Sequence, residues 1–334
     1  MRKPQDQQLI GESPAFLEVL ERVSRVAPLN RPVLVIGERG TGKELIASRL
    51  HFLSGRWDYP LIKMNCAALA ESLLETELFG HEAGSFTGAA KRRLGRFELA
   101  NKGSLFLDEL SSTSSGVQEK ILRVIEYGEF ERVGGSETIR TDVRIIGATN
   151  EDLPRLAQDG KFRADLLDRL AFDVITLPPL RERPGDIMTL ANHFAIKMAG
   201  ELGQDVFNGF SEQAQNELLN YRWPGNVREL KNVVERAVYT CQDQDQAIVE
   251  IIFDPFDSPW RPGPEPGHKT TAEPELPTDP YDFKQSIQDE EVARIKSAMA
   301  HCRFNQKKTA EFLGMTYHQL RGYLRKYELT ENDE

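Results

Sequence analysis

The residues of this chain best suited to bind a phosphate chain lie between Gly37 and Lys43, in the sequence GERGTGK. An apolar run that predicts a buried strand, Val33 to Ile36, comes before them, and a helical pattern begins at about Glu44. Glycines let backbone N–H groups curl around the β- and γ-phosphates, while the lysine adds a charge and the helix adds its dipole. The alternative is a glycine-rich turn that happens to precede a helix. We predict an ATP or GTP site formed by Gly37, Glu38, Arg39, Gly40, Thr41, Gly42, Lys43 and Glu44.

Glu44 departs from the general motif, in which a Ser or Thr hydroxyl after the lysine reaches Mg²⁺. Metal binding must then depend on another acid, and the stretch Gly103 to Glu109 offers one. It reads as an apolar strand that ends in Asp108 and Glu109. Because ligands bind at the carboxyl ends of parallel strands, Asp108 is expected to hold Mg²⁺ and Glu109 to polarise the attacking water. The alternative is that both acids merely cap the next helix.

Two more strands are expected to end in polar side chains at the same edge of the sheet, Pro60 to Asn65 and Val143 to Asn150. Asn65 would reach the nucleotide region, although such a residue alone is more often part of a turn. Thr149 and Asn150 are placed to sense the γ-phosphate or the water. Helices at about 14–27 and 114–128 and a loop at 131–141 complete this part of the prediction.

The stretch Glu77 to Arg93, ELFGHEAGSFTGAAKRR, contains an aromatic residue flanked by glycines. Phe86 has no evident core to fill there, so the stretch could form a contact surface. A surface loop whose phenylalanine folds back on the body is an equally good interpretation. The residues concerned are Gly84, Ser85, Phe86, Thr87, Gly88 and Ala89.

Two arginines on a predicted helix, Arg163 and Arg169, could be offered to the γ-phosphate of a neighbouring subunit as arginine fingers. Asp165 and Asp168 lie nearby in the sequence, so local salt bridges are the alternative.

A small helical lid is expected after the break at 177–180. Within it, Asn226 is a plausible N-cap with Glu229 as its capping-box partner. Arg228 would oppose the helix dipole there, which suggests an anionic partner such as phosphate.

The end of the chain has the pattern of a helix–turn–helix after a proline-rich linker at 254–281. The first helix is expected to end at Leu313, with the turn at Gly314 and the cap of the second helix at Thr316. A basic three-helix bundle that binds protein is the alternative to DNA binding. The candidate DNA contacts are Lys307, Lys308, Thr316, Tyr317, His318, Arg321 and Arg325.

Composition limits the remaining possibilities. The chain has 334 residues and a net charge of −10, which argues against a surface that coats nucleic acid but allows a small basic module. The sequence has no apolar run of membrane-spanning length and no signal-peptide core, so we expect a cytoplasmic protein without direct membrane insertion. Its three cysteines are far apart and suggest neither a disulfide framework nor a zinc site.

Together these motifs resemble those of the bacterial enhancer-binding proteins, AAA+ activators of RNA polymerase carrying sigma-54. The resemblance covers residues 9–327 and includes Walker A at 37–44, where Glu after the Lys is usual, and Walker B at 105–109. The signature insertion lies at 77–89. Its usual motif is GAFTGA, and this chain has Ser85 in place of the alanine, which puts the fine tuning of the loop in question. The arginine-finger helix at 162–170, the sensor II stretch at 223–230 and a Fis-like helix–turn–helix complete the match.

The resemblance implies a role for each matching residue. Lys43 would contact the β- and γ-phosphates, and Asn65 would hold Glu109 in an inactive pose. Thr149 and Asn150 resemble sensor I. Arg163 and Arg169 would act in trans as arginine fingers on the nucleotide of a neighbouring subunit. Arg228 would be the sensor II residue of the lid, and Phe86 and Thr87 would contact sigma-54.

The resemblance also implies an α/β AAA+ domain with a parallel sheet (1–176), an all-helical lid (177–253), the linker (254–281) and an all-α Fis-like helix–turn–helix domain (282–334). Its expected cofactors are ATP and Mg²⁺. Its expected partners are sigma-54, RNA polymerase, enhancer DNA and further copies of the chain in a homo-hexamer. The AAA+ module begins by about Leu9, so no receiver domain is expected before it.

That layout resembles the branch of the family that activates phage-shock (envelope stress) genes, and it implies control in trans by a phage-shock protein A-type negative regulator, with Trp57 on the regulatory surface. Two other functions are open. One is an AAA+ DNA-binding ATPase of the replication-initiator type. The other is a repressor that uses nucleotide only as a structural ligand.

Overall fold

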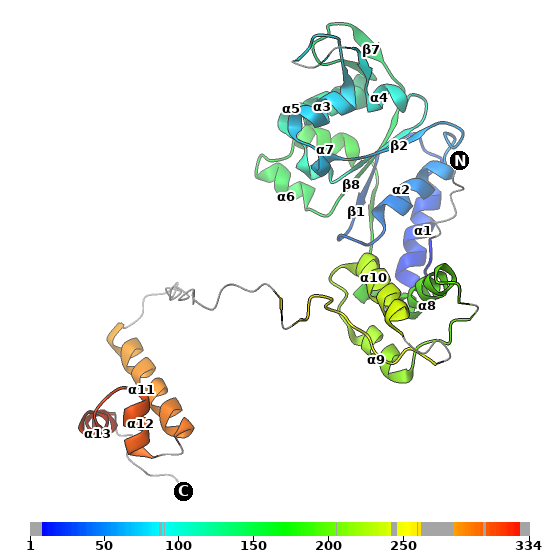
Figure 1. Ribbon diagram of the computed structural model, residues 1–334. Coiled ribbons are helices and arrows are strands. Elements are labelled where there is room, and N and C mark those ends of the chain that lie inside the picture. Colours follow the sequence, from blue (N-terminus) through cyan, green and yellow to red (C-terminus); the bar gives the residue numbers. More distant parts are fainter. Residues whose placement is uncertain are drawn as a thin grey trace. The chain divides into compact units, whose positions relative to one another are not determined.

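The protein is described by a computed structural model that covers residues 9–86, 89, 91–204, 206–241, 246–258, 260–261, 283–302 and 305–327. The chain divides into two compact units, Met1–Asp257 and Ser258–Glu334 (Figure 1). Each unit is described separately below.

A five-stranded parallel sheet forms the centre of the first unit. Its strands lie in the order β2-β5-β8-β1-β9. Because all neighbours are parallel, the carboxyl ends of the strands meet at one edge. The predicted α/β class is confirmed. The bounds of the strands are β1 Val33–Ile36, β2 Leu61–Asn65, β5 Ser104–Asp108, β8 Arg144–Thr149 and β9 Val174–Thr176.

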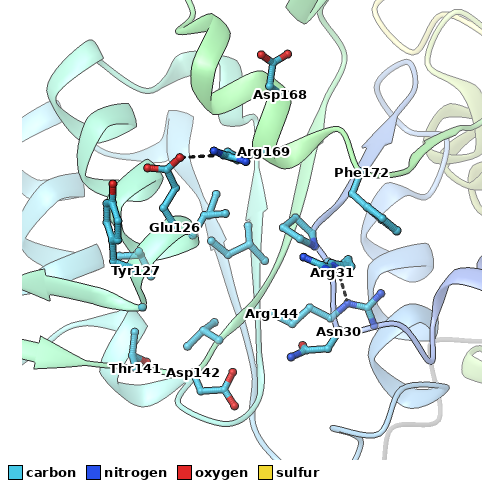
Figure 2. Close-up of a pocket in the computed structure, with 16 residues that line it drawn as sticks. Asn30, Arg31, Glu126, Tyr127, Thr141, Asp142, Arg144, Asp168, Arg169 and Phe172 are labelled. Carbon is cyan, nitrogen blue, oxygen red and sulfur yellow. Dashed lines mark hydrogen bonds and ion pairs between the residues drawn. The ribbon is translucent and has the colours of Figure 1, made fainter.

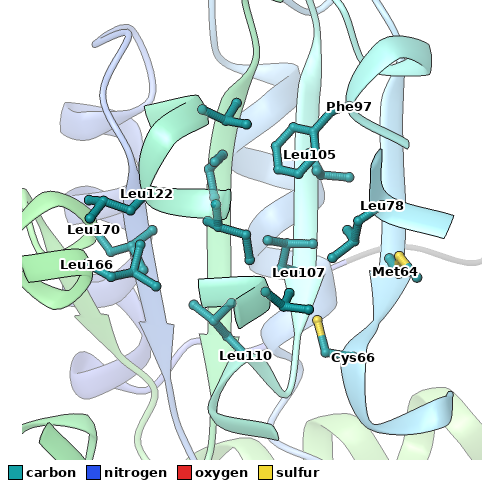
Figure 3. Close-up of a cluster of buried hydrophobic side chains, with 14 of the residues drawn as sticks. Met64, Cys66, Leu78, Phe97, Leu105, Leu107, Leu110, Leu122, Leu166 and Leu170 are labelled. Carbon is teal, nitrogen blue, oxygen red and sulfur yellow. The ribbon is translucent and has the colours of Figure 1, made fainter. Parts of the chain in front are cut away.

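Helices cover both faces of this sheet because successive strand residues point to opposite sides. In β1, Leu34 belongs to one buried cluster, while Val33 and Val35 belong to the other. The first cluster joins the sheet to α3 (Glu71–Phe79), α5 (Ser115–Tyr127) and α7 (Ala164–Leu170), and part of it is drawn in Figure 3. The second joins the sheet to α1 (Pro14–Val26) and α2 (Lys43–Phe52).

The predicted loop at 131–141 is largely a β-hairpin. The antiparallel strands β6 (Glu129–Glu131) and β7 (Thr138–Arg140) pair with Phe130 opposite Ile139, and Phe130 is buried in the core. The sequence signal is weak because each strand has only three residues. The other short elements of this region are η1 Cys66–Ala68, β3 Gly80–His81, β4 Arg93–Leu94, α4 Arg96–Leu99, η2 Leu110–Ser112, β6 Glu129–Glu131, β7 Thr138–Arg140 and α6 Leu153–Gln158.

The helical region that follows has a core of its own, centred on the fully buried Trp223. It contains a short parallel bridge between Phe210 and Ile248 in addition to its helices. Figure 1 shows α8, α9 and α10 grouped beside one end of the sheet domain. The bounds are η3 Leu180–Glu182, α8 Pro184–Glu201, α9 Glu212–Asn220 and α10 Asn226–Thr240.

The second unit is a small helical fold built from α11 (Phe283–His301), α12 (Gln306–Phe312) and α13 (Tyr317–Lys326). Gly314 makes the turn with a φ of +66°, which favours glycine. The Thr316 side chain accepts from the Gln319 N–H, and Gln319 bonds back to Thr316, which completes a capping box. The predicted helix–turn–helix is therefore confirmed. No helix in the described part of the chain has the length and apolar character needed to cross a bilayer.

Candidate functional site

The phosphate loop connects β1 to α2 at the carboxyl edge of the sheet. Gly40 and Gly42 have φ angles of +79° and +101°, a conformation that glycine adopts at little cost. Lys43, the first residue of α2, is buried and donates from Nζ to the Gly37 carbonyl at 2.8 Å. Burial lowers the pKa of Lys43, while the nearby carboxylates of Glu109 and Asp108 act in the opposite direction. The Lys43 amine and the first turn of α2 therefore lie at the same loop, as a phosphate site requires.

Asp108 is the last residue of β5 and Glu109 follows it, and both lie close enough to Lys43 to raise its pKa. The Glu109 N–H donates to Asp108 Oδ1 at 3.1 Å. Glu109 has a φ of +52°, which is uncommon for a residue other than glycine, and such strained conformations cluster at functional sites. Glu109 occupies the N-cap position of η2, yet its side chain makes no capping hydrogen bond. Its carboxylate lies 3.9 Å from Arg39 Nε instead, which disfavours the interpretation as a helix cap.

Asn65 and Asp108 are register partners in adjacent parallel strands. Asn65 Oδ1 accepts from the Ala67 N–H at 2.9 Å, so its side chain forms a local turn in this structure. The hydrogen bond between Asn65 and Glu109 that the resemblance implies is not formed here, because Asn65 bonds to Ala67 and Glu109 faces Arg39.

Thr149 is the last residue of β8 and Asn150 follows it, at the same edge of the sheet. Thr149 is fully buried; its Oγ1 lies 3.1 Å from the Ser111 hydroxyl and accepts from the Glu151 N–H at 3.0 Å. Asn150 is exposed. The threonine is therefore held rigidly at the edge of the site, and the asparagine is available to solvent.

The lid reaches the phosphate loop through the start of α10. The Val227 N–H donates to the Gly40 carbonyl at 3.1 Å, and Arg228 is close enough to lower the pKa of Lys43. The prediction of Asn226 as N-cap is wrong: Gly225 takes that position, and Asn226 is the first helical residue, fully buried with a φ of +53°. The Asn226 amide is turned toward the phosphate loop rather than toward its own helix.

The two candidate arginine fingers are paired within the chain. Arg163 donates to Asp165 at 2.7 Å, as the local alternative proposed. Arg169 donates to Glu126 at 2.8 Å rather than to Asp168. Figure 2 shows Arg169 and Glu126 at a pocket of about 630 Å³ that lies at the amino ends of β1 and β8. Arg169 is therefore at the opposite edge of the sheet from the phosphate loop of its own chain.

The stretch from Glu77 to Arg93 begins in the last turn of α3 and continues into β3, which pairs antiparallel with β4. Phe86 is 45% exposed and meets the ring of His81 edge-on, with 5.0 Å between centroids. The ring contact agrees with a phenylalanine that folds back on the body of the protein, and the exposed part of the side chain leaves a surface for contact with a partner. Ser85 Oγ donates to the Glu82 carbonyl at 2.8 Å, Gly84 has a φ of +81°, and Ala89 is buried. Thr87 and Gly88 lie outside the described residues.

Sequence reasoning missed the buried Arg132, which lies at the base of this stretch. Arg132 donates to Glu98 at 2.5 and 3.0 Å and to Glu82 at 2.7 Å. These hydrogen bonds raise the pKa of Arg132, that to Glu98 most strongly. The partners are 34 and 50 residues away, so no local pattern could have indicated them.

Two other groups of predicted residues are accessible. Trp57 is 60% exposed near the end of α2. In the helix–turn–helix unit Tyr317 is half-buried. The exposed candidates are Lys307, Lys308, Thr316, His318, Arg321 and Arg325.

Comparison with known proteins identifies the family. Residues 9–176 match the sigma-54 interaction domain, residues 181–252 the AAA+ ATPase lid domain, and residues 286–327 the Fis family of bacterial regulatory proteins. The chain belongs to the sigma-54-dependent transcriptional activators. Members of this family interact with sigma-54, and their AAA+ domain binds adenine nucleotides and implies ATPase activity.

Individual relatives agree with this assignment. The chain is 57% identical over 321 residues to the Psp operon transcriptional activator of Escherichia coli, which covers 96% of this chain and 98% of that protein. It is 43% identical to a Nif-specific regulatory protein of Azotobacter vinelandii, over 93% of this chain but only 57% of that protein. The crystal structure of NtrX from Brucella abortus in complex with ATP is 31% identical, with a TM-score of 0.69, over 96% of this chain and 70% of that one.

Proposed function

We propose that this chain is an enhancer-binding activator that hydrolyses ATP to remodel the closed complex of sigma-54 RNA polymerase. The observation that supports this best is the convergence of an amine, two acids and a lid arginine on one phosphate loop. Lys43 would bind the β- and γ-phosphates, Glu109 would polarise the attacking water, and Arg228 would reach the phosphates from the lid.

Asp108 suits Mg²⁺ because a carboxylate is a hard oxygen ligand and Mg²⁺ bound with nucleotide needs only one or two of them from the protein. Mg²⁺ would neutralise charge on the phosphates. Asn65, Thr149 and Asn150 would respond to the γ-phosphate from the same edge of the sheet.

We further propose that ATP lies between subunits of a homo-hexamer. Arg169 lies at the edge of the sheet remote from its own phosphate loop, so the phosphates it could reach belong to a neighbour. Arg163 would act in the same way, and both arginines would exchange Asp165 and Glu126 for phosphate on assembly.

The remaining assignments complete the proposal. Residues 84–89 would contact sigma-54. The domains would span 1–176, 177–253, 254–281 and 282–334, and the exposed residues around α13 would bind enhancer DNA. The similarity to the E. coli psp activator supports phage-shock genes as targets. A phage-shock protein A-type regulator would then bind the surface that includes Trp57.

The test is sigma-54 binding by the full chain in the presence of ADP plus a metal fluoride, which mimics the transition state. We expect binding with the mimic and little with ADP alone, and its loss in Thr87→Ala. Thr76→Ala on α3 is a matched control, since its hydroxyl donates to the Leu73 carbonyl one turn earlier. ATPase activity without sigma-54 binding would favour the replication-initiator function. Absence of turnover would favour the nucleotide-liganded repressor.

A further inference from the structure

A group of hydrogen bonds joins the phosphate loop to the lid, and none of the roles above accounts for it. Its members are Glu38 of the loop and Arg181 and Asn226 of the lid, and we call it the clasp. Arg181 donates to both carboxylate oxygens of Glu38, at 2.6 and 2.9 Å. Asn226 Nδ2 donates to Glu38 Oε2 and to the Arg39 carbonyl, both at 3.0 Å. The hydrogen bonds from Arg181 and then Asn226 lower the pKa of Glu38 to about 2, so the clasp holds a carboxylate at neutral pH.

Asn226 is the centre of the clasp. Its Oδ1 accepts from the Leu180 N–H at 2.8 Å, so the amide makes one bond within the lid and two to the phosphate loop. The residue is fully buried and has a φ of +53°, which asparagine tolerates better than most residues. Such a conformation persists where the surrounding bonds determine it. Glycine could adopt this φ but would lose all three hydrogen bonds.

The backbones also meet at the clasp. The Val227 N–H donates to the Gly40 carbonyl at 3.1 Å, and a Cβ on Gly40 would lie 2.2 Å from the Gly225 carbonyl oxygen. Only glycine fits at position 40 while the lid stays in place. Arg228 lies in the same first turn of α10, so the clasp fixes where this arginine stands relative to the loop.

We propose that Asn226 is a positioning residue for nucleotide. Through the clasp it holds the lid against the phosphate loop, so that Arg228 and the loop contact the phosphates of the same nucleotide. The inference rests on the proposed function only in taking ATP as the ligand. Without the clasp, part of the free energy of ATP binding is spent on ordering the lid, so the affinity for ATP falls. The groups of the sheet edge, Lys43, Asp108 and Glu109, are not part of the clasp and remain in place.

The discriminating change is Asn226→Asp, measured by equilibrium binding of a fluorescent ATP analogue to the full chain. The aspartate keeps the acceptor for the Leu180 N–H and tolerates the backbone angle, but it places a second carboxylate against Glu38. We expect the Kd to rise about tenfold or more, while kcat at saturating ATP stays within about threefold of the wild-type value. Adding Glu38→Gln supplies an amide donor to the introduced carboxylate, and it should return the Kd to within about threefold of Glu38→Gln alone.

Asn220→Asp is the matched control, because it makes the same charge change at an exposed position of the lid, where the Asn220 amide donates to the Asn216 carbonyl. A Kd for folded Asn226→Asp within about threefold of wild type, or a loss that Glu38→Gln does not relieve, would overturn the proposal. If Asn226→Asp does not fold, Arg181→Met removes the ion pair at a partly exposed position, and an unchanged Kd there refutes the clasp. A wild-type chain that binds the analogue but fails to activate transcription refutes the proposed function and leaves this test valid.

Discussion

Replacing Asp186 by alanine tests how the start of α1 is held against the lid. Asp186 is completely buried in the first turn of α8, and its Oδ1 accepts from the N–H groups of Glu12 and Ser13 at 2.7 and 2.8 Å. Its Oδ2 accepts from the Ser13 hydroxyl at 2.7 Å. Ser13 is the N-cap residue of α1 but makes no side-chain cap itself. Asp186 therefore supports the start of a helix that belongs to the other subdomain.

The size of the effect follows from burial and charge. Hydrogen bonds to a charged acceptor are worth about 1.5–3 kcal/mol each, but the three share one carboxylate and are not additive. Arg183, which is 2% exposed and whose Nη1 lies 3.9 Å from Asp186 Oδ2, would lose this neighbouring negative charge. Removing one partner of a buried pair costs about 3–5 kcal/mol. We expect Asp186→Ala to lower the free energy of unfolding by about that amount.

The assay is urea unfolding followed by the fluorescence of Trp223, which is fully buried in the lid. The chain has three tryptophans, so Trp57→Phe and Trp260→Phe leave Trp223 as the single reporter. Ser13→Ala removes only one of the three bonds and should cost about 1 kcal/mol. A change below about 1 kcal/mol for Asp186→Ala would show that the buried carboxylate does not hold α1 to the lid.

Two other predictions concern the sheet edge. Glu109→Gln should leave ATP binding intact and lower turnover by at least about 10²-fold, because it removes the proposed general base; hydrolysis at the wild-type rate in a steady-state assay would eliminate that role. Burial, followed by the charges of Asp108 and Glu109, raises the pKa of the Cys66 thiol to about 12. Cys66 should therefore resist a thiol reagent at a pH of about 8 until the protein unfolds, whereas Cys241 and Cys302, which are partly exposed, should react in the native state. Three reactive thiols in the native protein would contradict this expectation.

The sequence predicted what depends on local pattern. The alternation of Val33, Leu34 and Val35 between two buried clusters is the consequence of a short apolar run in a sheet covered on both faces. The phosphate loop, the acids after β5 and the Gly314 turn were located in the same way, because each depends on neighbours in the chain.

Contacts between segments that are distant in the sequence could not be predicted from local patterns. Glu38 and Arg181 are 143 residues apart, and Asp186 and Ser13 are 173 apart. Asn226 was misplaced because its type and its spacing to Glu229 fit a capping box, whereas tertiary hydrogen bonds take its amide elsewhere. Prediction from neighbouring residues failed where the lid contacts the sheet domain.

The nature of that junction explains how the lid is held beside the sheet although it has a core of its own. The lid has its own apolar core, and the clusters on the two faces of the sheet are separate from it, although Ile10 packs against the lid core. The described links between them include two sets of directional polar bonds, those of Asp186 to the start of α1 and those of the clasp to the phosphate loop. Breaking a polar bond of this kind opens no cavity, whereas a packed core cannot be separated at similar cost. The clasp and the Asp186 link can therefore hold the lid in one position while the lid and the sheet keep separate cores.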